Sequence, residues 1–161
     1  MATMREQILA RAETLLSTTP PSGVPTVKRT RIDSPVITDL PALTLVQWND
    51  AVAPQGASRP DEPDRDDSSM DGALVNRWVD LRIEALAAGS DGVPEDAACD
   101  PLLAWVVKAL LAEGAFTGLA NRVRELGTQF EYERAERPFC RATMTVRVKY
   151  QSKTDDAELR Y

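Results

Sequence analysis

The sequence contains no histidine, and this limits the chemistry that the chain can perform. Histidine is the commonest general base, proton shuttle and metal ligand in proteins. No G-x-S-x-G, P-loop or G-x-G-x-x-G motif is present either. Acyl transfer and nucleotide binding therefore have no motif to support them. We expect a non-enzymatic protein with no cofactor and no metal site, and an enzyme is the third alternative.

A second place to look for chemistry is the dense group of carboxylates between Ala51 and Asp71. Its members are Asp61, Glu62, Asp64, Asp66, Asp67 and Asp71. Catalytic carboxylate pairs are held on rigid elements, and the glycine and terminal glutamate of an EF-hand are missing here. The stretch is rich in proline and nearly devoid of apolar residues, so it buries too little to offset the entropy of ordering. We expect a long mobile loop over 51–71, either a solvated hairpin tip or a functional segment.

The two cysteines, Cys99 and Cys140, are too few and too far apart for a disulfide framework or a metal cluster. They favour a reducing compartment. Cys140 falls on the expected core side of a strand, which favours a buried structural thiol over a nucleophile. Cys99 precedes an expected helix, a position that can depress a thiol pKa, but the sequence offers no partner base.

The charge distribution disfavours tight binding to nucleic acid. The net charge is −6 and the sequence pI is about 4.8, whereas duplex DNA requires a clustered basic surface. The single basic cluster comprises Lys28, Arg29 and Arg31. We interpret it as a solvated or subunit-facing strand surface, with DNA contact as the alternative. The N-terminal residues 1–17 mix charged and apolar side chains, so they resemble neither a signal peptide nor a membrane span, and we expect a cytoplasmic location.

Periodicity predicts the elements that position these residues. Thr3 and Glu6 have the spacing of a capping box, and an apolar stripe follows through residue 16. A second helix is expected with Asp100 as its N-cap and Pro101 as its first residue. Strands are expected over 24–32, 40–48, 74–87, 128–134 and 139–151, with a short helical turn or connection within 117–126. The stretch 74–87 also fits a helical stripe, and its β-branched residues favour a strand.

The last strand has the clearest pattern in the chain. One set of alternating residues is apolar and should face the core: Cys140, Ala142, Met144, Val146, Val148 and Tyr150. The other set includes Arg141, Arg147 and Lys149, which we expect on a wet or subunit-facing surface. These elements predict an α+β fold, with a single largely antiparallel sheet of about five strands packed with two helices. They form one domain over 1–151, followed by a flexible tail over 152–161.

Several segments resemble the tail terminator and tail completion proteins of long-tailed phages, the family of the lambda-like minor tail protein U. They are the N-terminal helix, "LPAL" at 40–43, "DPLLAWVVKALL" at 100–111, and "GTQFEYERAERPFCRATMTVRVKYQS" at 127–152. The resemblance covers about three quarters of the chain. It implies a non-enzymatic structural virion protein at the head-proximal end of the tail, assembled in the host cytoplasm.

The same resemblance implies the partners. The chain would form a homo-hexameric ring that caps the tail tube protein, ends polymerisation and offers a surface to a head–tail connector or stopper protein. DNA would pass through without specific binding, and no membrane is involved. A ring needs two different complementary patches on each subunit. The candidate subunit or partner interfaces are two strands, one with Lys28, Arg29 and Arg31 and the other with Arg141, Arg147 and Lys149. The acidic loop is a candidate lining of the lumen, where it would repel phosphate.

Two alternatives remain open at the level of sequence. A tail tube or head–tail connector subunit has a similar α+β composition. A small bacterial binding module is the alternative from another class, and in it the basic strand would contact a ligand.

Overall fold

The computed structural model of the chain describes residues 3–18, 20–21, 23, 27–29, 40–52, 74–90, 92–133 and 138–153. These residues form two helices and one five-stranded sheet. In chain order the elements are α1 (Met4–Ser17), β1 (Lys28–Arg29), β2 (Ala42–Val52), β3 (Leu74–Ala88), α2 (Glu95–Leu110), β4 (Arg122–Glu133) and β5 (Phe139–Lys153).

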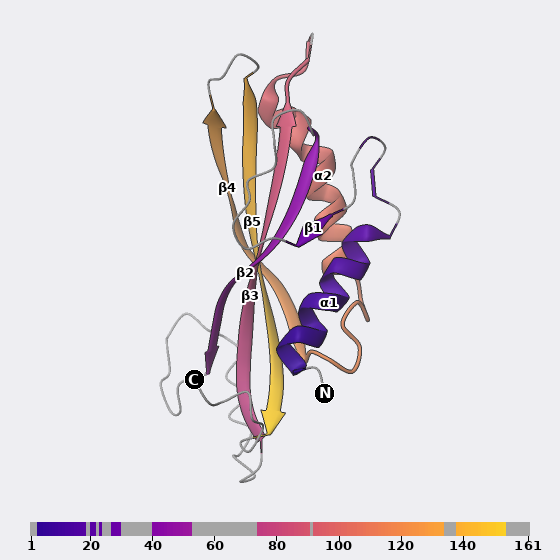
Figure 1. Ribbon diagram of the computed structural model, residues 1–161, viewed down its shortest axis with the longest axis vertical. Helices are drawn as coiled ribbons and strands as arrows, with labels where there is room; N and C mark the ends of the chain where they lie inside the picture. The colour runs from indigo at the N-terminus through magenta and orange to yellow at the C-terminus, as the bar shows by residue number, and fades with distance from the viewer. Residues whose placement is uncertain are drawn as a thin grey trace.

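The sheet has the strand order β1-β2-β3-β5-β4, and both helices lie on the same face of it (Figure 1). The four long strands are antiparallel to their neighbours, whereas β1 pairs with β2 in parallel. The predicted α+β class, the antiparallel sheet and the two helices are confirmed. The fifth strand is only two residues long, so the sheet is essentially four long strands with a short parallel addition at one edge.

Helix α1 begins where the capping box predicts. The Thr3 hydroxyl oxygen accepts a hydrogen bond from the Glu6 backbone N–H at 3.0 Å, which satisfies one of the free donors of the first turn. Its buried side chains share one face and pack into the core: Ile8, Leu9, Ala12 and Leu16. The Arg11 side chain donates a hydrogen bond to the Ala115 carbonyl at 2.8 Å, and this bond connects α1 to the turn after α2.

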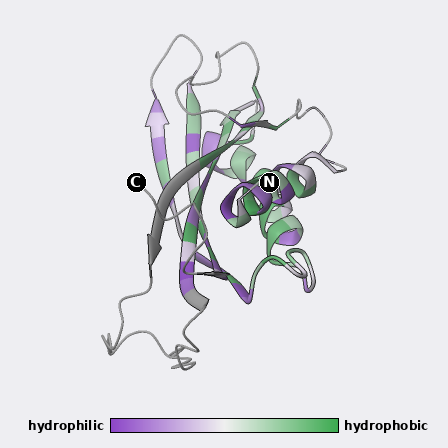
Figure 2. Cartoon of the chain, turned by 60° about the horizontal axis from the view of Figure 1, so that its bottom comes forward, coloured by the Kyte–Doolittle hydropathy of each residue, from purple (hydrophilic) through white to green (hydrophobic). Residues whose placement is uncertain are grey.

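Strands β3 and β5 form the centre of the sheet and pair without interruption from Leu74↔Lys153 to Ala88↔Phe139. The predicted core face of β5 is confirmed, since every member from Cys140 to Tyr150 is buried. Hydrophobic and hydrophilic colours both occur along the central strands (Figure 2), and burial alternates from one residue of β5 to the next over most of its length. Apolar side chains thus fill the space between sheet and helices, and the opposite face carries the polar set.

The predicted start of the second helix is wrong. α2 begins at Glu95 with Pro94 as its N-cap, and Pro101 lies inside it. The physical reason is burial of the turn before the proline: Cys99 is fully buried and directs its thiol at the carbonyls of Cys140 (3.5 Å) and Ala85 (3.8 Å). This packing outweighs the helical hydrogen bond that proline removes.

The helical turn or connection predicted within 117–126 is wrong over its second half, 122–126, which is strand. The chain turns through residues 112–119, and β4 then begins at Arg122, six positions before the expected strand start. The register shifts between Glu125 and Gly127, which marks a β-bulge inside the strand. Gly127 has φ of 150°, a conformation that other residues rarely adopt.

Several predicted boundaries move by two to four residues. β2 continues through Val52, into the start of the predicted loop over 51–71, and β5 continues through Lys153, into the predicted tail over 152–161. Of the strand predicted over 24–32, only Lys28–Arg29 is a strand among the described residues. The remainder of that loop, of that tail and of that strand beyond residue 29 lies outside the described residues.

Candidate interaction surfaces

The structure separates the two groups of basic residues that the sequence suggested as interfaces. Lys28 and Arg29 form β1 at one edge of the sheet, whereas Arg141, Arg147 and Lys149 lie on β5 in the middle of it. Arg31 and the acidic residues Asp61, Glu62, Asp64, Asp66, Asp67 and Asp71 lie outside the described residues. The two basic groups therefore belong to different surfaces.

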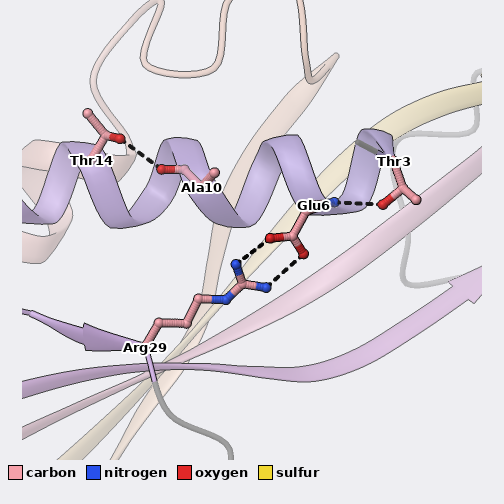
Figure 3. A network of polar contacts seen from close by, with 5 residues as sticks. All are labelled: Thr3, Glu6, Ala10, Thr14 and Arg29. Atoms are coloured by element: carbon pink, nitrogen blue, oxygen red, sulfur yellow. Dashed lines mark hydrogen bonds and ion pairs between the residues drawn. The ribbon is translucent and has the colours of Figure 1, made fainter. Parts of the chain in front are cut away.

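Arg29 connects β1 to the first helix. Its guanidinium donates two hydrogen bonds to the Glu6 carboxylate, at 2.6 and 2.9 Å (Figure 3). The hydrogen bond that Arg29 donates to Glu6 raises the pKa of Arg29 above its ordinary value. The two side chains remain 30% and 44% exposed, so the pair is accessible to a partner even though its charges are balanced.

We call the sheet surface opposite the helices the polar face: Trp78, Asp80, Arg82 and Glu84 of β3, with Arg141, Thr143, Thr145, Arg147 and Lys149 of β5. At its centre Arg147 donates two hydrogen bonds to Asp80, at 2.7 and 2.9 Å. The same guanidinium lies 4.8 Å from the centre of the Trp78 ring, within cation–π range. The Asp80 side chain is only 6% exposed, so this pair is largely withdrawn from solvent.

Two more ion pairs neutralise charge on the polar face. Arg141 contacts Glu133 of β4 at 2.9 Å, and Arg82 contacts Glu84 at 3.1 Å. Arg141 and Arg147, two of the predicted interface residues, thus already have carboxylate partners within the chain. A protein partner that used them would have to compete with these pairs.

A third surface, which sequence reasoning missed, lies along β4, the last strand of the sheet among the described residues. Phe130 and Tyr132 point to the helix side of the sheet, beyond the cover of α2, and are 43% and 61% exposed. With Pro94, Asp96, Ala97 and Asp100 from the start of α2 they line an open hollow of about 220 Å³. We call these six residues the aromatic corner.

Polar contacts fix the aromatic corner. The Tyr132 hydroxyl donates to the Asp96 carboxylate at 3.4 Å, and partial loss of hydration together with that negative charge raises the pKa of the phenol. The alternation of Phe130 and Tyr132 was visible in the sequence. What was not visible is that β4 is the last strand of the described sheet and that Phe130 and Tyr132 remain exposed beside the start of α2.

The cysteines are structural. Cys140 is fully buried, as predicted. Burial, followed by the influence of Cys140, raises the pKa of the Cys99 thiol from 9.0 to about 12, because the charged thiolate is poorly hydrated in the core. The helix-terminus effect considered for Cys99 is therefore wrong, since this residue lies in the second turn of α2 and faces the sheet. Within the described residues no group of three or more potential ligands is arranged to hold a metal ion.

Comparisons with known proteins add no relative. No protein-family model matches the sequence, and a search of curated proteins gave no match. Among the described helices, none has the length and apolar character needed to cross a membrane. Function must therefore be argued from the surfaces themselves.

Proposed function

We propose that this chain is a structural virion protein of a long-tailed phage, a tail terminator. Copies of it form a hexameric ring on the end of the tail tube, stop its polymerisation and present a surface to the head–tail connector or stopper protein. The protein acts at the head-proximal end of the tail and assembles in the host cytoplasm. The proposal rests on the sequence resemblance and on the edges of the sheet.

The observation that carries the proposal is the difference between those two edges. One edge is β4, a twelve-residue strand with exposed aromatic side chains on its helix side. The other is the two-residue strand β1, which carries only basic residues. An open strand edge is a template for pairing with another chain, and two unlike edges that meet produce a heterologous contact. Such contacts generate closed rings or open filaments, which are the architectures of terminators and tubes.

The polar face supports the same proposal in a different way. Its three arginines, Arg82, Arg141 and Arg147, are paired with carboxylates within the chain, which reduces the positive charge that this surface presents to DNA passing near it. The net charge of −6 also weakens attraction to phosphate. In the proposed ring, the acidic stretch 51–71 lines the lumen and DNA passes without specific binding.

The proposal is tested by the mass of the purified protein. We would measure light scattering over a concentration series, alone and with tubes of the tail tube protein encoded in the same genome. A discrete closed ring of six subunits, formed alone or on tube ends whose growth then stops, is expected. Unlimited filaments would indicate a tube subunit. A monomer that ignores the tubes would favour the small binding module.

A further inference from the structure

We propose that neighbouring copies join by pairing β1 of one copy with β4 of the next, in antiparallel orientation, so that one sheet continues from subunit to subunit. The inference rests on the proposed function and identifies which surfaces form the ring contact. The occupant of the β4 edge is thus a second copy of this chain.

The strand register supplies the first argument. Followed across the sheet, Lys28 pairs with Thr44, Thr44 with Glu84, Glu84 with Thr143, and Thr143 with Gln129. The next rung in the same way joins Arg29 to Thr128 through Leu45, Ile83 and Met144. The β1 edge is therefore level with the middle of β4. A copy related by rotation about an axis along the strands brings its own β1 to that level without any shift.

Strand direction supplies the second argument. β1 runs parallel to β2, and the remaining neighbours alternate in direction, so β1 and β4 run in opposite directions. A neighbouring copy in the same orientation then presents β1 antiparallel to β4. Antiparallel pairing needs no crossover and matches the rest of the sheet.

Charge and burial supply the third argument. The shared backbone register places Lys28 level with Gln129, two positions along β4 from Glu131. It places Arg29 opposite Thr128 and diagonal to Phe130 on the helix face. Diagonal cross-strand neighbours are within reach of long side chains, and opposite charges there are stabilising. The basic edge thus meets the second half of β4, which carries Glu131 and Glu133 and which we call the acidic half. The neighbour also covers part of the aromatic corner.

The arginine is suited to this position. Its guanidinium already bonds to Glu6 through its edge, and the flat face of a guanidinium can stack on an aromatic ring at the same time. Phe130, which is 43% exposed in the single chain, supplies such a ring. The contact therefore adds to the Arg29–Glu6 pair and does not break it.

The decisive experiment is a site-specific cross-link. The double variant Lys28→Cys/Gln129→Cys is treated with a short bismaleimide under conditions where the wild-type chain forms rings. A ladder of covalent species up to the closed ring is expected. The control is Lys28→Cys/Glu133→Cys, in which the second cysteine is on the same face of β4 but about 13 Å further along the strand, and its ladder should be lost. The native thiols Cys99 and Cys140 are buried and leave the background low.

Charge exchange gives an independent test that keeps both edges. Lys28→Glu or Glu131→Lys alone should weaken association by up to about fivefold at each contact, and the two changes together should restore it. Lys108→Glu, on the exposed side of α2, makes the same change of charge away from both edges and should leave association unchanged.

The outcomes separate this inference from the proposed function. Rings that form normally without the Lys28–Gln129 cross-link, and without any effect of charge exchange, would overturn the β1–β4 contact and leave the terminator proposal standing. Cross-linking of the single variant Gln129→Cys to itself would show β4–β4 pairing, which also overturns the contact. A wild-type chain that forms no ring, alone or on tubes, removes both proposals.

Discussion

Two ion pairs that each have two hydrogen bonds lie in different surroundings. The Asp80–Arg147 pair is mostly withdrawn from solvent, with side-chain exposures of 6% and 17%, whereas the Glu6–Arg29 pair is 44% and 30% exposed. Solvent screens an exposed pair, while a buried one interacts strongly and leaves a costly unpaired charge when one partner is removed.

A double-mutant cycle on each pair should measure this difference. With alanine at Asp80 and Arg147, we expect a coupling free energy of about 2 kcal/mol in chemical unfolding. The matched cycle on Glu6 and Arg29 should give about 0.5 kcal/mol. Equal coupling energies for the two cycles would show that burial of the polar face does not govern its stability.

The Cys99 thiol gives a prediction for alkaline pH. Its pKa is raised from 9.0 to about 12 in the folded chain, so above pH 9 the unfolded chain loses a proton that the folded chain keeps. The free energy of unfolding should therefore fall as pH rises from 9 toward 12. Below pH 9 the thiol is protonated in both states, so it causes no change of stability with pH there. Denaturant titrations of wild type and Cys99→Ala should show a shallower fall for the variant. Parallel pH profiles for the two proteins would contradict the assignment.

At the scale of single elements, Pro101 decides between two starts of α2. If the helix begins at Glu95, proline at the seventh position removes a hydrogen bond and crowds the preceding turn. Pro101→Ala should then raise the free energy of unfolding by about 1–3 kcal/mol, since the side chain is exposed. If the helix began at Asp100, the same change would be neutral or destabilising, and Asp100→Ala would cost about 1 kcal/mol. Thermal or denaturant unfolding of both variants distinguishes the two.

The elements that the sequence predicted well are those whose pattern is local. α1 has a capping pair and an apolar stripe, and β5 has six buried residues in strict alternation, from Cys140 to Tyr150. The errors fall where tertiary contacts override local preference. Because Cys99 is buried in the core, α2 begins before Asp100, the N-cap that the sequence predicted. Because residues 122–127 pair with β5, they form part of β4 although their sequence is compatible with a helix.

The candidate surfaces could be predicted only in part, for a related reason. Residue type and alternation identified the basic residues of β1 and β5. They did not reveal that Arg141 and Arg147 have carboxylate partners, Glu133 and Asp80, because each pair forms only when two strands lie side by side in the sheet. The aromatic corner likewise depends on which strand lies at the edge of the sheet. The periodicity of a single strand does not predict the order of strands in a sheet.

At the scale of the whole molecule, the proposed assembly should depend on salt. The contact joins a basic edge to an acidic half-strand, both at the surface, so mobile ions screen it. Raising NaCl from about 0.05 to about 0.5 M shortens the screening length severalfold and should shift the light-scattering mass toward the monomer. Unfolding by denaturant serves as the control, because the core should respond little to the same salt. Rings that become more stable at high salt would point to an apolar contact instead.

The unbroken pairing of β3 with β5 has a mechanical consequence. Fifteen consecutive residue pairs join the two strands, which at about 3.3 Å per residue makes a ribbon about 50 Å long. Its inter-strand hydrogen bonds lie across the strands. A force that slides one strand along the other strains all of these bonds at once, whereas a force that peels the strands apart strains them one by one from an end. The subunit is therefore a stiff strut under shear along its strands and is weakest to tearing at its tips.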